Sequence, residues 1–441
     1  MSRDRRAIYV NCDGLARDWV TRATTPTLHD LAGKSLWCRE HRAVFPSVTR
    51  VSAASVATGC HARRHGLHGN RMGLIEQSRI VVRDVGLPDF RQHLRKATGR
   101  TLHVPALAER VAGAGGFVGF SNVSPGAAYF LDPEHFGHIY HRAGSYGPGG
   151  APIGGADALN VSHDLAGDRV MTERFCGDVL LERSPVVSIL WLANPDLTLH
   201  GAPIGSPAHH EALRQADRNV GRVHRSVEQL RSRGIDVLLL IGSDHGQETI
   251  GDCVDLESWF SAQGLSAMLA AGDIAVAGQG TAALLYATPQ ARPALLDVLE
   301  VMRREPWVAD IVTDDFAQLG HAASGGVVAA VNTARREEAN AYGVIGKRWV
   351  IAEPGKPAAI GCGQHGGWGP DETSPFLMLD HPEVGHRSCT RPTSLVDIAP
   401  TILAFLGLPS DGCDGTPLVD FASKAMRAAD DSEPSRAPSK S

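Results

Sequence analysis

The sequence lacks the features that would place it in several special classes of protein. No apolar run reaches the roughly 20 residues that a membrane-spanning helix needs, and the first apolar stretch stops at Asp13, too early for a secretion signal. The eight cysteines are scattered without a Cys-x-x-Cys pair, which excludes a disulfide scaffold and a cysteine-rich zinc knuckle. A formal charge of −5 gives no basic excess for a nucleic-acid backbone. We therefore expect a cytoplasmic protein whose partners include neither a nucleic-acid polymer nor a membrane.

What is present is typical of a large globular protein. The chain has 441 residues, of which 43% are hydrophobic and 21% charged, enough for a sizeable core and an inserted or second domain. Apolar, strand-like runs alternate with helical patterns, which predicts an α/β fold with a mostly parallel sheet buried on both faces. We expect strands at Ala7–Cys12, Gly116–Ser121, Val186–Ala193, Val237–Gly242 and Pro375–Leu379.

The composition also divides the chain into parts. Residues 250–358 have a strand-helix-strand character of their own, and we expect an inserted cap subdomain there, within a catalytic domain formed by residues 1–249 and 359–420. Residues 124–160 are rich in Gly, Pro, Ala and His and predict a long irregular segment. Residues 421–441 lack apolar content and predict a disordered tail.

Two Asp-His signals follow apolar runs. The first, SILWLANPDLTLH, carries Asp196 and His200, and the second, DVLLLIGSDHGQ, carries Asp244 and His245. Carboxylate and imidazole together suit Zn²⁺ or Mn²⁺. Open α/β sheets bind ligands at the carboxyl ends of their strands. A helix predicted between the two motifs, ending at Gly234, returns the chain from one strand to the next.

Three further residues become candidates beside these motifs. Asp13 ends the first expected strand, and Gly14 allows a tight turn after it. Thr49 precedes a helical run of small residues, where backbone N–H groups stabilise an anion, although a threonine there also serves as a helix cap. His365 lies in a glycine-rich loop before a strand, where backbone can approach a metal ion or a phosphate.

With these motifs in order, the chain resembles the alkaline phosphatase superfamily, and within it the type I phosphodiesterase/nucleotide pyrophosphatase branch, which includes phosphonoacetate hydrolase. The motifs are Asp13, Thr49 with Ala57-Thr58-Gly59, Asp196-x-x-x-His200, Asp244-His245-Gly246 and His365-Gly366. The resemblance extends to the C-terminal SLVDIAPTILAFLGLPSDGCDGTPL. It implies a three-layer α/β sandwich like that of alkaline phosphatase, with a mostly parallel central sheet and a cap.

The resemblance also implies two divalent metal ions, usually zinc, with manganese as the alternative. One ion would be held by Asp196, His200 and His365; the other by Asp13, Thr49, Asp244 and His245. Thr49 would be the nucleophile that forms a phospho-threonine, which water then hydrolyses. Asn70 and the backbone N–H of Thr49 would bind a phosphoryl oxygen. The implied activity is that of a phosphodiesterase acting on a small anionic phosphate or phosphonate, and a homodimer is compatible with it.

The sequence departs from the family around the nucleophile. Arg50 follows Thr49, where nucleotide-cleaving relatives carry an aromatic residue; it would contact a carboxylate or second phosphate of the substrate, or form a structural salt bridge. The lysines that bind the carboxylate in phosphonoacetate hydrolase have no match in VGFSNVSPGAAYF. Tyr129, His138 and His141 are further candidate substrate contacts.

Three alternatives frame the expected function. A sulfatase is excluded because Thr49 stands where that family needs a Cys or Ser in a Cys/Ser-x-Pro-x-Arg motif. Hydrolysis of a carbon–phosphorus bond, as in phosphonoacetate hydrolase, is the second choice. A non-catalytic metal-binding protein on the same fold is the remote one, since no expected ligand is missing.

Overall fold

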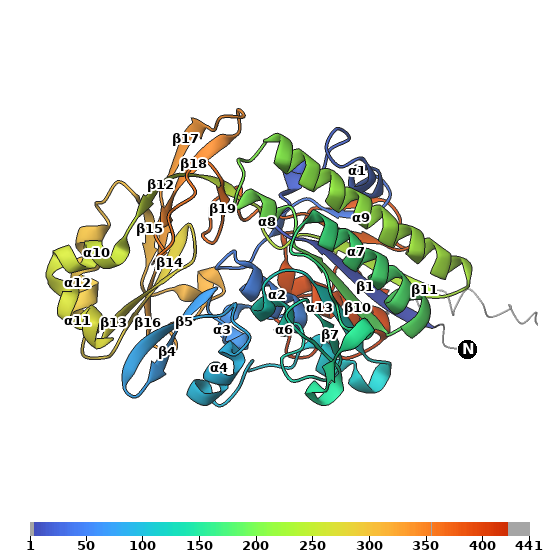
Figure 1. Cartoon of the computed structure of the whole chain (residues 1–441), viewed down its shortest axis with the longest axis horizontal. Coiled ribbons are helices and arrows are strands. Elements are labelled where there is room, and N and C mark those ends of the chain that lie inside the picture. Colours follow the sequence, from blue (N-terminus) through green and yellow to red (C-terminus); the bar gives the residue numbers. More distant parts are fainter. Residues whose placement is uncertain (1–3, 354, 422–441) are drawn as a thin grey trace, which may run out of the picture.

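The computed structural model describes residues 4–353 and 355–421. A mixed, mostly parallel sheet forms its centre, with β11, β1, β10 and β6 parallel in the middle (Figure 1). In spatial order the strands are β21 (Arg387–Cys389), β2 (Leu36–Cys38), β20 (Leu377–Asp380), β11 (Asp236–Gly242), β1 (Arg5–Cys12), β10 (Val187–Leu192), β6 (Phe117–Ser121), β7 (His138–Tyr140), β8 (Ser145–Tyr146) and β9 (Pro152–Ile153). All five predicted strands are present, and the last of them, β20, runs antiparallel to β11.

Helices cover both faces of this sheet. Successive side chains of a strand point to opposite faces, and because both sets are apolar here, both faces must be buried. On β1, Tyr9 joins the core under one helical layer, whereas Ile8 and Val10 join the core under the other. The first layer holds α2 (Thr49–Thr58), α6 (Pro125–Tyr129) and α13 (Ile398–Leu406); the second holds α1 (Pro26–Ala32), α7 (Leu165–Arg174) and α9 (Pro207–Ser232). The predicted three-layer α/β sandwich is confirmed.

Helix α9 shows how the sequence specifies this layer. Its first turn is capped by Ser206, whose hydroxyl oxygen accepts from the His209 N–H at 3.3 Å. Its apolar residues recur on one side and are buried against the sheet. Gly234, just beyond its end, has a φ of +86°, as the predicted helix stop requires.

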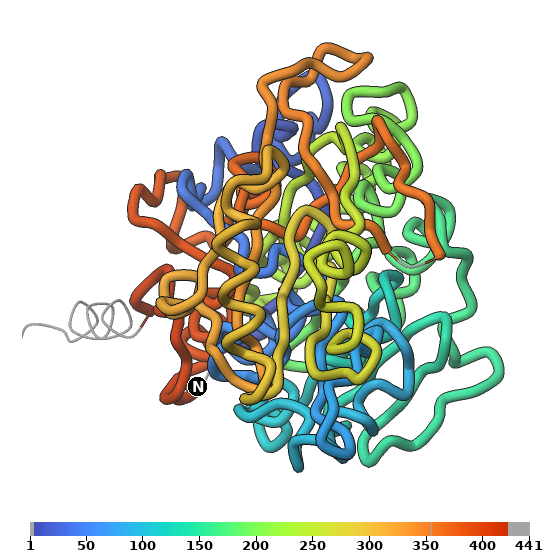
Figure 2. Tube along the Cα trace, turned by 90° about the vertical axis from the view of Figure 1, so that its left-hand side faces the viewer, coloured from blue at the N-terminus to red at the C-terminus, as the bar shows by residue number. Residues whose placement is uncertain are grey.

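The range predicted as a cap, residues 250–358, lies beside the carboxyl edge of the sheet and in front of the rest of the chain in Figure 2. We call this part of the structure the cap. Two four-stranded sheets build it, one of β17 (Arg335–Ala339), β18 (Ile345–Ile351), β12 (Glu248–Val254) and β19 (Gly363–Gln364), the other of β13 (Ile274–Gly278), β14 (Ala282–Ala287), β16 (Val327–Thr333) and β15 (Val308–Val312). Helices α10 (Leu256–Phe260), α11 (Ser266–Ala271) and α12 (Arg292–Met302) complete it. A hairpin of β4 (Arg71–Glu76) and β5 (Arg79–Asp84), outside the predicted cap range, packs against β13.

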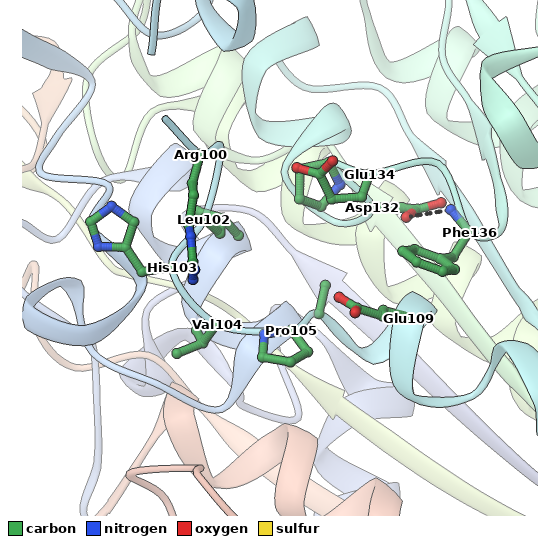
Figure 3. A pocket seen from close by; sticks show the side chains of 11 residues that line it. Arg100, Leu102, His103, Val104, Pro105, Glu109, Asp132, Glu134 and Phe136 are labelled. Carbon is green, nitrogen blue, oxygen red and sulfur yellow. Dashed lines mark hydrogen bonds between the residues drawn. The ribbon is translucent and has the colours of Figure 1, made fainter. Parts of the chain in front are cut away.

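The prediction of an irregular segment at residues 124–160 was wrong in part. The segment forms α6 and the edge strands β7, β8 and β9, because its short apolar groups are buried against the central sheet. With residues 100–109 it walls a pocket of about 160 Å³ (Figure 3). There the carboxylate of Asp132 accepts from the backbone N–H of Phe136 at 3.0 Å.

Two other expectations concern the ends and the surroundings of the chain. Of the predicted tail, 421–441, only Phe421 lies within the described residues; it is buried against Phe405 and His381. Among the described helices, none combines the length and apolar character needed to cross a membrane.

Buried histidines line the contact between α3 (Ala62–His65), the hairpin and the cap. His68 packs against His321 with ring centroids 4.8 Å apart, and His65 Nε2 lies 3.1 Å from the hydroxyl of Ser55. Burial lowers the pKa of His65 to about 3 and that of His321 to about 4. The folded protein therefore keeps these rings neutral, whereas the unfolded chain takes up protons below its ordinary pKa of 6.5.

We predict that the free energy of unfolding is insensitive to these rings above pH 6.5 and falls as the pH drops from 6.5 towards 4. Each excluded proton contributes a slope of about 1.4 kcal/mol per pH unit. Urea unfolding measured across this range should give a shallower slope for His65→Gln than for the wild type. The exposed His386→Gln serves as the control with an unchanged slope. Equal slopes in wild type and His65→Gln would contradict the assignment.

Candidate metal centre

Three neighbouring strands deliver the acidic candidates to one edge of the sheet. Asp13 follows β1 directly, Asp244 follows β11 after one residue, and Asp196 begins α8 (Asp196–Leu199) shortly after β10. Because β1 lies between β10 and β11 and is parallel to both, the three chain segments leave the sheet on the same side. Gly14, with a φ of +70°, turns the chain beside Asp196, where a Cβ would approach the Asp196 Cβ to 2.8 Å.

The first group of side chains surrounds the ring of His245. Its Nε2 lies 3.3 Å from Asp13 Oδ1, 3.3 Å from Asp244 Oδ2 and 3.3 Å from the hydroxyl of Thr49. Both carboxylates and the imidazole are fully buried. Burial raises the pKa of Asp13 well above its usual range, and the neighbouring charge of Asp244 adds to the rise.

The ring of His245 is surrounded by buried acceptor atoms. Its Nδ1 lies 2.9 Å from the carbonyl oxygen of Gly246, which can only accept, so Nδ1 carries the proton. The Nε2 atom of the same ring faces two carboxylates. Asp13 Oδ1 and Asp244 Oδ2 are buried and lack a hydrogen-bond partner among the described residues. A divalent cation fits this convergence of acceptors.

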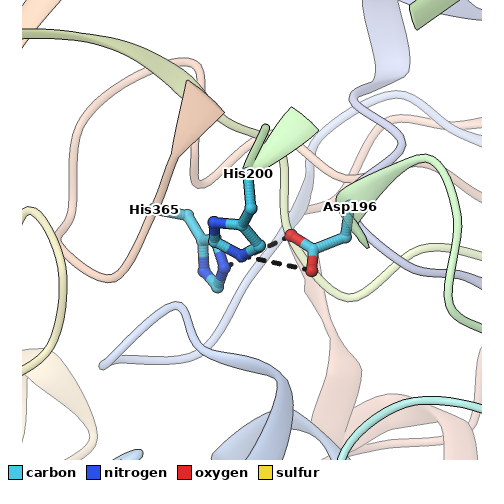
Figure 4. A group of neighbouring side chains, drawn as sticks. All are labelled: Asp196, His200 and His365. Carbon is cyan, nitrogen blue, oxygen red and sulfur yellow. Dashed lines mark ion pairs between the residues drawn. The ribbon is translucent and has the colours of Figure 1, made fainter. Parts of the chain in front are cut away.

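The second group consists of Asp196, His200 and His365 (Figure 4). Asp196 Oδ2 lies 3.3 Å from His200 Nε2, and Asp196 Oδ1 lies 3.4 Å from His365 Nε2. His365 Nδ1 donates to the carbonyl of Ser47 at 2.7 Å, which orients the ring so that its Nε2 faces the Asp196 carboxylate. Burial alone would raise the pKa of Asp196, but His200 and His365 hold it well below its usual range.

The two groups lie side by side. The rings of His245 and His365 stack with centroids 3.6 Å apart at an interplanar angle of 14°. Asp196 also lies close enough to Asp13 and His245 to complete a three-residue ligand set with them. The structure thus brings together all seven predicted ligands, with Asp196 between the two groups. A further acidic group at His224, Glu228 and Asp380 is already bridged by Arg231, 2.7 Å from both carboxylates.

Several residues that sequence reasoning missed hold these ligands in place. Trp191 donates to Asp13 Oδ2 at 3.0 Å, and Asn11 donates to Asp244 Oδ1 at 3.2 Å. Gln247 donates to Asp196 Oδ1 at 2.5 Å. Asn11 and Trp191 lie within predicted strands. The sequence signal for their roles was a side chain with a hydrogen-bond donor, an amide or an indole, in an otherwise apolar run.

The buried carboxylate of Asp168, on α7, positions the loop that leads into Asp196. It accepts from the backbone N–H groups of Ala193 at 3.1 Å and Asn194 at 3.0 Å. It also accepts from the side-chain amides of Asn122 and Asn194. No sequence signal distinguished this aspartate from an ordinary helical one.

A glycine fixes the loop that carries His365. Gly366 has a φ of +136°, and a Cβ there would lie 1.5 Å from the carbonyl oxygen of Gln279 in the cap. Glu372 accepts from the N–H groups of Gly367 and Gly369 in the same loop at 3.0 and 2.8 Å. The cap and the metal-ligand loop are therefore one packed unit.

A cavity of about 590 Å³ opens between these groups and the cap. His200, His365, Asn70 and Arg50 line it. Asn70 Oδ1 accepts from the Arg50 N–H at 3.4 Å, which leaves its amide nitrogen as the donor. Arg50 forms an ion pair with Asp84 at 3.1 Å and donates hydrogen bonds to the Asn70 carbonyl and the Ser124 hydroxyl. Of the two roles predicted for Arg50, the structure therefore shows the structural salt bridge.

The other predicted substrate contacts lie elsewhere. Tyr129 and His141 are buried and do not line this cavity. The Tyr129 hydroxyl donates to the Gly144 carbonyl at 3.2 Å, and His141 Nε2 lies 2.9 Å from the Val123 carbonyl. His138 stacks on Tyr140. These partners give the three side chains packing roles in the described structure.

Comparison with known proteins identifies the family of the chain. The sequence model described as type I phosphodiesterase / nucleotide pyrophosphatase matches residues 7–355. No curated protein matches the sequence.

Solved structures of three proteins share the fold at low sequence identity. Murine ectonucleotide pyrophosphatase/phosphodiesterase 5, an inactive variant in complex with AMP, is 15% identical with a TM-score of 0.65, covering 94% of this chain and 98% of its own. Phosphonoacetate hydrolase from Sinorhizobium meliloti 1021, in complex with phosphonoformate, is 14% identical with a TM-score of 0.65, covering 92% and 96%. Alkaline phosphatase PafA is 12% identical with a TM-score of 0.70, covering 95% and 99%. These structures show the fold that the resemblance predicted. The predicted family is confirmed: the chain belongs to the type I phosphodiesterase/nucleotide pyrophosphatase family.

Proposed function

We propose that this protein is a metal-dependent phosphoric ester hydrolase of the phosphodiesterase type, acting on a small phosphodiester with two divalent ions, most simply zinc. The observation that carries the proposal is the convergence of buried, unpaired acceptors of Asp13 and Asp244 on His245 Nε2, beside the hydroxyl of Thr49. Such ions, when bound, polarise the phosphoryl group and stabilise the entering and leaving oxygens. The cytoplasmic location and the homodimer stay predictions.

Different residues of the chain have different roles in the proposed reaction. Thr49 Oγ1, at the N-terminus of α2, attacks phosphorus, and the bond from phosphorus to the leaving alcohol breaks. The hydroxyl proton of Thr49 leaves with that alcohol. Water then cleaves the phospho-threonine, restoring the hydroxyl and releasing a phosphomonoester. The Asn70 amide and the N–H groups at the start of α2 bind the phosphoryl oxygens.

Phosphodiester hydrolysis is favoured over cleavage of a carbon–phosphorus bond. Lys356 is the lysine that lines the cavity among the described residues, and it forms a surface ion pair of 2.8 Å with Glu353. A pair of lysines for the carboxylate of phosphonoacetate is therefore not formed. Phosphonoacetate turnover far above that of all phosphodiesters would reverse this choice.

We predict that Thr49→Ala lowers turnover of bis-p-nitrophenyl phosphate by about four orders of magnitude or more, because the nucleophile is lost. Thr49→Ser, which keeps a hydroxyl at the same place, should retain measurable turnover. Zinc bound per chain, measured in parallel, confirms that the site is intact. Substantial turnover by a zinc-loaded Thr49→Ala protein would contradict the covalent route.

We predict that the purified protein binds two zinc ions per chain and that each ligand group can be emptied separately. Asp13→Asn removes a charge from the His245 group, and His365→Ala removes a ligand from the Asp196 group, so each variant should retain about one ion by elemental analysis. His224→Ala, in the acidic group bridged by Arg231, is the matched control and should retain both. Unchanged zinc in Asp13→Asn would show that the buried carboxylates are not ligands.

A further inference from the structure

The walls of the cavity restrict what the substrate carries beyond its phosphoryl group. Apart from the two metal-site histidines, the lining comprises aliphatic and small residues, amides and charged side chains, and no Phe, Tyr or Trp among the described residues. Apart from these histidines, the described lining of the cavity offers no aromatic ring on which a nucleobase would stack. Its apolar wall is formed by short side chains such as Ile250, Val350 and Ala352.

Two arginines line this cavity, and their surroundings differ. The guanidinium of Arg50 has three partners, with Asp84 as its counter-ion. The guanidinium of Arg71 forms no ion pair and no hydrogen bond with any described residue, and its buried Nε lacks a partner. Arg71 is half-buried, and a guanidinium without a counter-ion in a partly enclosed cavity can bind an anion through charge-assisted hydrogen bonds.

The backbone around Arg71 is held in place. The side chain of Gln279, on the cap, accepts from the Asn70 N–H at 2.7 Å and donates to the Arg71 carbonyl at 2.7 Å. Arg71 begins β4 directly after Asn70, which faces the phosphoryl site. The same two hydrogen bonds thus fix both the phosphoryl-binding amide and the free arginine relative to the cap. Lys356, the other cation of the cavity, is exposed and already paired with Glu353.

We propose that Arg71 is a specificity-determining residue, binding a second anionic group, a carboxylate or phosphate, on the portion of the substrate that lies against the cap. This inference rests on the proposed function and names its substrate class: a small, non-aromatic phosphodiester with a further negative charge. It also transfers to Arg71 the anion contact that the sequence assigned to Arg50.

The test compares two p-nitrophenyl phosphodiesters that share one leaving group, one with a 2-carboxyethyl and one with an n-propyl second ester. The zinc-loaded wild type should favour the carboxylate ester in kcat/KM by roughly tenfold or more, the value of a charge-assisted hydrogen bond. Arg71→Met should lose that preference, with kcat/KM on the carboxylate ester falling to about the level of the propyl ester in the same variant. Arg79→Met removes an exposed charge from the same hairpin and should keep the preference.

A binding measurement separates failure of this inference from failure of the proposed function. 3-Phosphonopropionate should bind the zinc-loaded protein roughly tenfold more tightly than propylphosphonate by calorimetry, and Arg71→Met should remove the difference. If neither ester is hydrolysed but this difference holds, the proposed function fails and the anion subsite stands. Two results would overturn the inference. One is a wild type that shows equal kcat/KM for the two esters and equal affinity for the two phosphonates. The other is a carboxylate preference that survives in Arg71→Met.

Discussion

The rest of the structure depends on a cluster of buried acceptors that repel one another unless a cation lies among them. Asp13 and Asp244 are excluded from solvent, and Nε2 of His245 lies 3.3 Å from a carboxylate oxygen of each. Removing two carboxylates from water without compensation costs several kcal/mol for each charge. The surrounding donors, Trp191 and Asn11, satisfy the outer oxygens and leave the inner ones unpaired. The fold is thus arranged to hold charge at one point of the sheet edge.

Much of this arrangement was predictable because it follows from local rules. An apolar run buried on both faces, followed at once by Asp or His, fixes both the strand and the edge at which its ligand lies. Asp13, Asp196, Asp244 and His245 were identified in this way, and the structure gathers them within hydrogen-bonding distances of shared atoms. The helix that carries Thr49 begins at that residue, as its small-residue pattern indicated.

What sequence patterns did not specify are contacts between segments far apart in the chain. Residues 124–160 form edge strands through pairing with β6, a long-range effect that composition does not encode. For Arg50 the sequence left open a substrate contact or a structural salt bridge, and only the fold shows the salt bridge, to Asp84 on the hairpin. Arg71 went unnoticed for the converse reason: only the folded cavity shows that it has no partner. Charge pairing, unlike periodicity, is a property of the tertiary structure.

The measurement that tests this account most directly is a crystal structure of the zinc-loaded protein with anomalous diffraction at the zinc edge. The account predicts two zinc peaks, one among His245, Asp13 and Asp244 and the other among His200, His365 and Asp196. An empty His245 group, with a protonated ring joining the two carboxylates in fully active protein, would contradict it.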